Sequence, residues 1–194
     1  MAFVSAILLA AGESTRMGRQ KALLPWEGTT LLAYQLAQLA VVDAIREILV
    51  VSGHRPARVT AITSAGERAR VVHNGDYRTG KAGSIRAGLA AVSQDCAAIL
   101  LLAVDQPRAS SLIQRVVDAH IGIRALITVP ANDGHRGHPV VFSSALRGEM
   151  AAIDEETLGV RALMQRHADE VFILEVADPA VLLDLNSPGD IPAA

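Results

Sequence analysis

The sequence predicts an α/β fold, a Rossmann-like three-layer sandwich in which helices cover both faces of a mostly parallel sheet. Short apolar runs rich in β-branched residues alternate with segments of helical period, which is the pattern of β-α-β units. Hydrophobic residues make up 51% of the chain and aromatic residues only 3%, as suits strands buried between helices. The 194 residues have the length of one domain, so we expect residues 1–194 to form a single domain.

The apolar runs place the strands. Residues 4–9 form the first expected strand, and residues 97–104, the most continuous apolar run, form a central strand buried on both faces and ended by Pro107. The other expected strands cover residues 47–51, 70–73, 125–129, 139–142 and 170–176. A loop is expected at residues 130–138, where Asn, Asp and Gly mark turns.

The expected helices lie between these strands. After the glycine-containing segment 12–28, Thr29 or Thr30 can cap a helix that presents a leucine face. Ser110 or Ser111 is expected to cap a helix that ends near residue 120. Further helices are expected at residues 57–65, 83–92 and 158–167.

Composition excludes several classes of function. A formal charge of −2 gives no global attraction to polyanions, and few aromatic rings are available to stack on bases, so we expect no nucleic-acid partner. No run approaches the ~20 apolar residues that span a bilayer. The apolar segment 3–11 lacks the positive region that opens a signal peptide, and the single cysteine, Cys96, fits a reducing compartment. We therefore expect a cytoplasmic protein without a membrane partner.

The segment after the first strand carries the strongest chemical signal. Ala10, Ala11 and Gly12 are small enough for backbone N–H groups to approach an anion. Arg16, Arg19 and Lys21 then place three cations within six residues, enough to bind a triphosphate. The spacing fits neither the P-loop nor the G-x-G-x-x-G dinucleotide pattern. Taken alone, the segment fits a solvated basic turn about equally well.

The motif L-x-x-G-x-S-x-R-M-G-x-x-K in this segment resembles the MobA-like nucleotidyltransferases, which build molybdenum-cofactor dinucleotides. Ala10-Ala11-Gly12, in place of the Gly-Gly form associated with guanylyl transfer, looks more like the MocA-type molybdenum cofactor cytidylyltransferases. Further landmarks follow in the family's order: Asn74 to Gly80 and Ser84, then D-Q-P at 105–107, G-H-P at 137–139, and a closing segment at 184–190. The resemblance implies the nucleotide-diphospho-sugar transferase-like version of the predicted fold.

The resemblance also implies the roles of individual residues. Arg16, Lys21 and Asp105 are the expected catalytic residues. The expected nucleotide-binding residues are Leu9, Ala10, Ala11, Gly12, Ser14, Arg16, Lys21, Asn74, Gly80, Ser84 and Asp105. Gln106, Pro107 and His138 are expected to bind the acceptor. Lys81-Ala82 stands where relatives often have a Gly-Met-type turn, so this side of the nucleotide site is expected to differ from theirs. The histidines other than His138 are expected to have structural or surface roles.

A magnesium site is expected beside the phosphates. Asp105 follows a buried strand, so its carboxylate should lie at the rim of the sheet where a hard cation would bridge substrate phosphates. Asn186 occupies the position where many relatives carry a second carboxylate, and Asp184 points to the same face if the segment is extended. Either of them could be the second ligand, and both could instead form a turn ahead of Pro188.

The resemblance implies transfer of CMP from CTP to the phosphate of molybdopterin, with Mg²⁺ as cofactor and pyrophosphate as leaving group. Guanylyl or other nucleotidyl transfer to a different phosphorylated acceptor is the alternative within the same chemistry. A non-catalytic chaperone that delivers the cofactor to a molybdoenzyme partner is a second alternative. An oxidoreductase is a third, against which the absence of a dinucleotide fingerprint argues.

Overall fold

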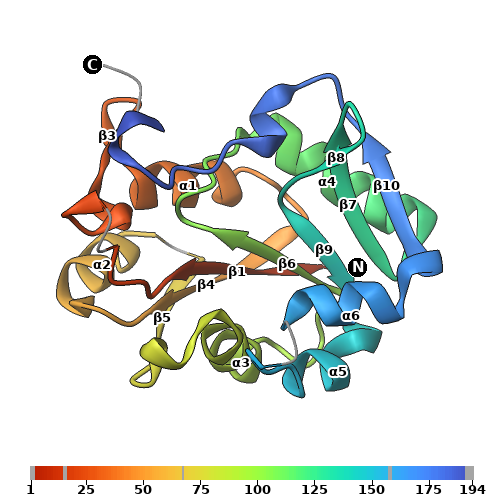
Figure 1. Ribbon diagram of the computed structural model, residues 1–194, viewed down its shortest axis with the longest axis horizontal. Coiled ribbons are helices and arrows are strands. Elements are labelled where there is room, and N and C mark those ends of the chain that lie inside the picture. Colours follow the sequence, from red (N-terminus) through yellow and green to blue (C-terminus); the bar gives the residue numbers. More distant parts are fainter. Residues whose placement is uncertain (1–2, 15–16, 67, 157–158, 191–194) are drawn as a thin grey trace.

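One eight-stranded sheet forms the centre of the protein (Figure 1), seen in a computed structural model that describes residues 3–14, 17–66, 68–156 and 159–190. Its order is β10-β7-β9-β6-β1-β4-β5, with β8 paired to β7. The strands are β1 (Val4–Ala10), β4 (Ile45–Ser52), β5 (Ala69–His73), β6 (Ala98–Ala103), β7 (Ile127–Asn132), β8 (His135–Arg136), β9 (Val140–Ser143) and β10 (Val171–Glu175). β9 runs antiparallel to both of its neighbours, β6 and β7, and β8 runs antiparallel to β7. The other pairs in the sheet are parallel.

Helices cover both faces of the sheet, and Figure 1 shows the resulting three layers. One face packs against α1 (Leu31–Ala40), α2 (Pro56–Thr63) and α4 (Ser110–Ile123). The other face packs against α3 (Lys81–Ala91), α5 (Arg147–Ala151) and α6 (Val160–Arg166). This arrangement confirms the predicted α/β fold class with a mostly parallel sheet.

Alternate side chains of the central strands supply the two halves of the core. In β1, Ala6 and Leu8 belong to the cluster under α1 and α4, whereas Ile7 and Leu9 belong to the cluster under α3. All seven residues of β1 are buried, because period-2 alternation in a doubly covered strand leaves no solvent face. β1 lies between β4 and β6 in the sheet, as expected for a strand without a polar face.

One expected helix cap is confirmed, and two other local expectations need correction. Thr30 caps α1 through a hydrogen bond from Ala33 N to its Oγ1 (3.2 Å), as predicted. Neither Ser110 nor Ser111 caps α4; Ala109 precedes that helix, and the Ser110 amide donates instead to Gln38 Oε1 on α1 (2.7 Å). The expected loop 130–138 contains the end of β7 and all of β8, which form a hairpin.

Other boundaries differ by a few residues. α3 begins at Lys81 rather than at residue 83. α6 begins at Val160, after the non-helical Gly159, and residue 158, the expected start, lies outside the described residues. α5 lies in a stretch for which no helix was expected. The segment 12–28 contains the 3₁₀ turn Lys21–Leu23 and β2 (Pro25–Trp26), which pairs with β3 (Thr29–Thr30).

Within the described part of the chain, no helix combines the length and the apolar character needed to cross a membrane. Cys96 is buried and forms no disulfide, as expected for a core residue, and its sulfur accepts a hydrogen bond from Arg147 Nη2 at 3.2 Å. His120 is also structural, because its ring nitrogen lies 2.9 Å from Thr128 Oγ1. Burial lowers the pKa of His120 to about 4.

Candidate active site

The candidate site lies where β1 and β6 end side by side. Leu9 pairs with Ala103 in the parallel ladder, so the chain segments that follow both strands leave the sheet at the same edge. In open α/β sheets this carboxyl edge is the usual place for a ligand. The segment after β1 carries Gly12 and Lys21, and the segment after β6 carries Asp105. The fold therefore brings together two motifs that are more than 80 residues apart in sequence.

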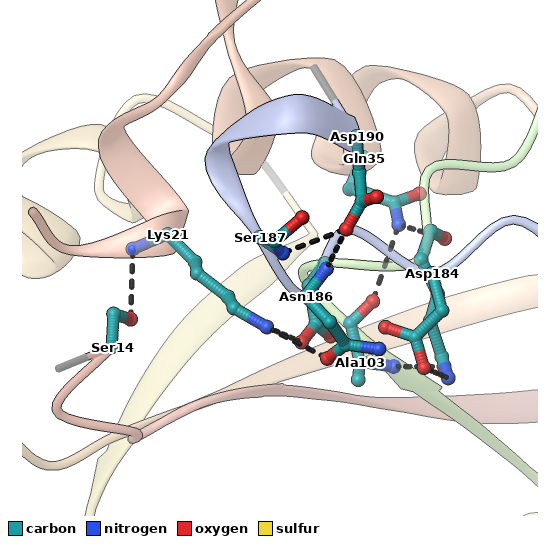
Figure 2. A network of polar contacts seen from close by, with 10 residues as sticks. Ser14, Lys21, Gln35, Ala103, Asp184, Asn186, Ser187 and Asp190 are labelled. Atoms are coloured by element: carbon teal, nitrogen blue, oxygen red, sulfur yellow. Dashed lines mark hydrogen bonds and ion pairs between the residues drawn. The ribbon is translucent and has the colours of Figure 1, made fainter. Parts of the chain in front are cut away.

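Lys21 is the centre of the polar cluster at this edge (Figure 2). Its Nζ donates to Asp105 Oδ2 at 2.7 Å and to Asn186 Oδ1 at 3.2 Å. The two side chains of the ion pair are only 14% and 21% exposed, for Lys21 and Asp105 respectively. Ser14 holds the backbone of the lysine, because the Lys21 amide donates to Ser14 Oγ at 3.0 Å.

The tail that follows 3₁₀ turn η6 (Pro179–Leu182) places Asn186 against Lys21. Leu185 N donates to the Asp105 carbonyl (2.9 Å), which ties the tail to the end of β6. Asp190 Oδ2 accepts from the amides of Ser187 (2.7 Å) and Asn186 (2.8 Å), and these bonds lower the pKa of the Asp190 carboxyl. Asp190 therefore shapes the turn that presents Asn186.

The geometry separates the two candidates for a second metal ligand. Asn186 Oδ1 and Asp105 Oδ2 both point at the Lys21 ammonium, so these two oxygens already converge on one cationic atom. Asp184 Oδ2 is instead 3.5 Å from Gln106 Nε2, although Asp184 also lines the cavity beside the cluster.

The Lys21 ammonium donates to one carboxylate oxygen and one amide oxygen, and these are the protein ligands that a hard divalent cation prefers, so a cation would fit at this position. Within the part of the chain that the structure describes, no group of three or more His, Cys, Asp or Glu side chains could hold a metal by itself. A cation at this position would therefore depend on ligands from a bound substrate, as magnesium commonly does.

A cavity of about 410 Å³ opens beside Lys21, and most of the predicted site residues line it. Those that do are Leu9, Ala10, Ala11, Gly12, Ser14, Lys21, Gly80, Ser84, Asp105, Gln106, Asp184 and Asn186. A Cβ built on Gly12 would meet nothing within 4 Å, so this turn leaves open space that the protein itself does not fill. We refer to this space as the first cavity. Arg16, a predicted catalytic residue, lies outside the described residues.

Among the predicted nucleotide-binding residues that the structure describes, Asn74 does not line the first cavity. It is buried, and its Nδ2 donates to Ser84 Oγ at 3.0 Å while its Oδ1 accepts from the Asp76 amide. Ser84 is buried and lies within α3 rather than at its start, so it does not cap the helix. Its hydroxyl accepts the hydrogen bond from Asn74 instead. Ser84 therefore lines the first cavity, and Asn74 supports Ser84 from outside the lining.

The predicted acceptor-binding residues separate in space. Gln106 is buried and held in the turn after β6, because its backbone oxygen accepts from Gln35 Nε2 at 2.6 Å and its side-chain oxygen accepts from Ala103 N at 3.2 Å. Pro107 is buried and lines neither cavity, so its position gives no support to acceptor binding. His138 belongs to a second cavity.

This second cavity, of about 740 Å³, adjoins the first along α3. It is lined by apolar residues of β6, β7, β9 and α6, and by the polar side chains of Lys81, Arg136, His138, Glu155 and Arg161. Burial, reinforced by the charges of Lys81 and Arg108, lowers the pKa of His138 to about 4, so the imidazole is neutral at pH 7. Its Nδ1 is buried and has no hydrogen-bond partner among the described residues.

Sequence reasoning missed a group of contacts beside the first cavity, among Glu13, Tyr77 and Arg78. Tyr77 lines that cavity, and its hydroxyl donates to Glu13 Oε1 at 3.1 Å. Arg78 Nε donates to the same oxygen at 2.7 Å and lowers the pKa of the Glu13 carboxyl. Glu13 thereby joins the loop after β1 to the segment before α3. An aromatic residue beside a cation, in a chain with few rings, was the signal that could have found this contact.

The fold and the site together define an α/β nucleotidyltransferase class of protein. A model of the MobA-like NTP transferase domain matches residues 6–171 of the chain, which is well over half of it. The chain therefore belongs to the MobA-like NTP transferase family, in agreement with the motifs at residues 8–21 and 105–107.

The chain is also similar to individual relatives and solved structures. The chain is 26% identical to the molybdenum cofactor cytidylyltransferase of Escherichia coli K12, over 100% of this chain and 96% of the relative. It is 31% identical to the nicotine blue oxidoreductase of Paenarthrobacter nicotinovorans, over 95% of this chain and 92% of the relative. The crystal structure of Rv0371c from Mycobacterium tuberculosis H37Rv superposes with a TM-score of 0.80 at 30% identity, covering 97% and 95% of the two chains. The same protein has also been solved in complex with manganese.

Proposed function

We propose that the protein transfers CMP from CTP to the phosphate of molybdopterin and releases pyrophosphate, with Mg²⁺ as cofactor. The observation that carries this proposal is the Lys21–Asp105–Asn186 cluster at the edge of the first cavity. A cation and two cation-binding oxygens occur there beside the open turn at Gly12, which is the combination that a triphosphate with its metal requires.

The proposed step is an in-line displacement at the α-phosphorus. An oxygen of the acceptor phosphate forms a bond to that phosphorus, and the bond to the bridging oxygen breaks, so pyrophosphate leaves with the electron pair. The nucleophile is already an anion, so the site needs no strong general base. Its contribution is positioning and neutralisation of charge.

The chain's own groups have separate tasks in this scheme. Lys21 neutralises charge at the α-phosphate, for which its position between Asp105 and Asn186 is suited. Arg16 and the amides of residues 10–12 hold the β- and γ-phosphates and stabilise the departing pyrophosphate. Asp105, with Asn186 or Asp184, would hold the divalent ion, which when bound supplies positive charge to the phosphates. The manganese complex of Rv0371c supports a divalent cation in this family.

Three observations favour CTP and a pterin acceptor over the alternatives. The Ala10-Ala11-Gly12 turn has the form that resembles the cytidylyltransferases. The Escherichia coli relative that spans the whole chain carries that activity in its name. The second cavity is large and mainly apolar, with cationic side chains at its walls, and so suits a fused-ring compound that bears a phosphate. A cytoplasmic location fits the single reduced cysteine.

Pyrophosphate release with each of the four nucleoside triphosphates, with and without molybdopterin and Mg²⁺, tests the proposal. We expect release only with CTP, acceptor and metal together. A preference for GTP would transfer the proposal to guanylyl chemistry. CTP and molybdopterin binding without pyrophosphate release would favour a chaperone that hands the cofactor to a molybdoenzyme.

Oxidoreduction is the second candidate, because the relative at 31% identity carries an oxidoreductase name. The sequence contains no G-x-G-x-x-G dinucleotide fingerprint, which argues against hydride transfer from a nicotinamide cofactor. Consumption of NADH or NADPH, measured with the same preparations, separates the two candidates. Consumption of either cofactor in the absence of any nucleotidyl transfer would favour oxidoreduction.

A further inference from the structure

The chain uses lysine at only two positions, Lys21 and Lys81, against sixteen arginines. Both lysines line the first cavity, although they come from segments 60 residues apart. Lysine differs from arginine in being a compact point charge with three rotatable donors, which suits a phosphate that changes geometry during a reaction. Both lysines of the chain therefore lie at the first cavity.

Lys81 also has a position that no other described residue shares. It lines both the first and the second cavity and thus stands at their junction. Its side chain is exposed, and it makes no hydrogen bond or ion pair within the described part of the chain. The other cations of the second cavity, Arg136 and Arg161, do not reach the first.

Folding does not explain this lysine. Lys81 is the first residue of α3, where the partial positive charge of the helix N-terminus disfavours a cation. The anion that this terminus favours is already supplied, because Glu155 Oε2 accepts from the Ala82 amide at 2.8 Å. A residue that is unfavourable for its helix, and that stands between two cavities, has a reason to be there other than stability.

We propose that Lys81 is a further catalytic residue, which binds the phosphate monoester of the acceptor at the junction and holds it against the α-phosphate of the nucleotide. This inference rests on the proposed nucleotidyl transfer. In that reaction one anionic phosphate must approach another, and their mutual repulsion is part of the barrier. An ammonium group that faces both cavities neutralises both partners, whereas Lys21 serves the nucleotide side.

Lys81→Met tests the proposal, with Lys81→Arg as the conservative variant and Arg58→Met as the charge-matched control. Arg58 is exposed on α2, on the opposite face of the sheet, and lines neither cavity. With molybdopterin as acceptor and CTP saturating, we expect Lys81→Met to lower kcat/KM for the acceptor by about 10²–10³-fold. Equilibrium binding of CTP should weaken far less than kcat/KM for the acceptor falls, because Lys21 still serves the nucleotide side. Lys81→Arg should recover part of the loss, and Arg58→Met should behave as the unmodified protein does.

A second measurement needs no variant. Reductive methylation followed by mass spectrometry reports on both lysines separately, since the chain has only two. Molybdopterin should slow modification of Lys81, and CTP with Mg²⁺ should slow modification of Lys21. Wild-type kcat/KM in Lys81→Met, or equal modification of Lys81 with and without molybdopterin, would overturn the inference alone. Absence of nucleotidyl transfer by the unmodified protein with any triphosphate would overturn the proposed function, and the inference with it.

Discussion

Lys21 is the residue for which structure and proposed chemistry agree most closely. Its ammonium contacts one carboxylate and one amide oxygen, and its backbone is held by Ser14. Ser14 has a positive φ of 55°, an uncommon conformation for a residue other than glycine, which its two hydrogen bonds to the following loop help to maintain. The loop therefore fixes where the Lys21 side chain begins, and the Asp105–Asn186 pair fixes where it ends.

Replacing Lys21 should separate activity from stability. We expect Lys21→Ala to lower turnover by about 10²–10³-fold, because a preorganised charge is lost from the α-phosphate. The protein should stay folded with a loss of about 1–3 kcal/mol in the free energy of unfolding, because the substitution leaves the mostly buried Asp105 carboxylate without its cation. Pyrophosphate release and a thermal melt measure the two effects, with Arg58→Ala as the control for loss of an exposed cation. Normal turnover in Lys21→Ala would remove the lysine from the mechanism.

Residues with a local signature could be predicted from the sequence, and residues that act through distant partners could not. The turn at Gly12, Lys21 and Asp105 were expected because a motif or a strand end marks them, and the fold brings them together. The role of Asn186 could only be left open, since its relation to Asp184 depends on a turn held by Asp190. No sequence signal around Glu155 indicates that its carboxylate accepts from the amide of Ala82 at the start of α3, 73 residues earlier.

At the scale of elements, one buried arginine connects three segments around the site. Arg108 is almost fully buried, and its guanidinium donates to the carbonyl oxygens of Pro107, His138, Val181 and Leu183 at 2.8–2.9 Å. Burial lowers its pKa to about 10, still far above neutrality, so it stays charged. The arginine thereby joins the turn after β6 to the loop before β9 and to the tail that carries Asn186.

Arg108→Met should destabilise the protein strongly. Each carbonyl left without a donor costs about 1–3 kcal/mol, so we expect a loss of about 3 kcal/mol or more in the free energy of unfolding. Urea unfolding measures this loss, and Arg108→Lys should restore part of it. Arg147→Met is a useful comparison, because Arg147 also donates to backbone carbonyls but is half-buried and remote from the tail. Equal stability of the Arg108→Met and unmodified proteins would refute this role.

Element boundaries were predicted where the signal is local and missed where it is tertiary. The cap of α1 was found because Thr30 lies next to the helix in sequence. The cap of α4 was missed because Gln38, on another helix, accepts from the Ser110 amide, while the amides of Leu112 and Ile113 donate to the Ala109 carbonyl rather than to a serine hydroxyl. The β7–β8 hairpin was missed because its turn residues Asp133 and Gly134 also fit a longer loop, and both have positive φ.

At the scale of the whole molecule, the sheet order decides which motifs meet. Placing β1 next to β6 joins the two strand ends that carry the lysine loop and the D-Q-P turn. The antiparallel strand β9 then lies beside β6, which brings His138 and the second cavity next to the first. Sequence patterns fix the strands but not their order, so the second cavity and the position of Lys81 could not be derived from the sequence.

The same arrangement predicts how nucleotide and metal act together. Asp105, Asp184 and Asn186 offer few oxygens, so a divalent ion needs phosphate oxygens to complete its shell. We expect Mg²⁺ alone to leave the melting temperature unchanged. CTP and Mg²⁺ together, at 100 times the dissociation constant, should stabilise the fold by about 2.7 kcal/mol. At 2–4 °C per kcal/mol for a chain of this size, the melting temperature should rise by about 5–11 °C.

The carboxylate-to-amide change Asp105→Asn should abolish the part of this shift that depends on Mg²⁺, because the replacement removes the negative charge while keeping the shape. Asp118→Asn is the matched control, since Asp118 is exposed on α4 and its carboxylate accepts a hydrogen bond from Gln114 of the same helix, away from the candidate site. Melts with CTP in Mg²⁺ and in excess chelator, for all three proteins, give the comparison. A full Mg²⁺-dependent shift in Asp105→Asn would place the metal elsewhere, and a shift with Mg²⁺ alone would mean that the protein completes the metal shell without nucleotide.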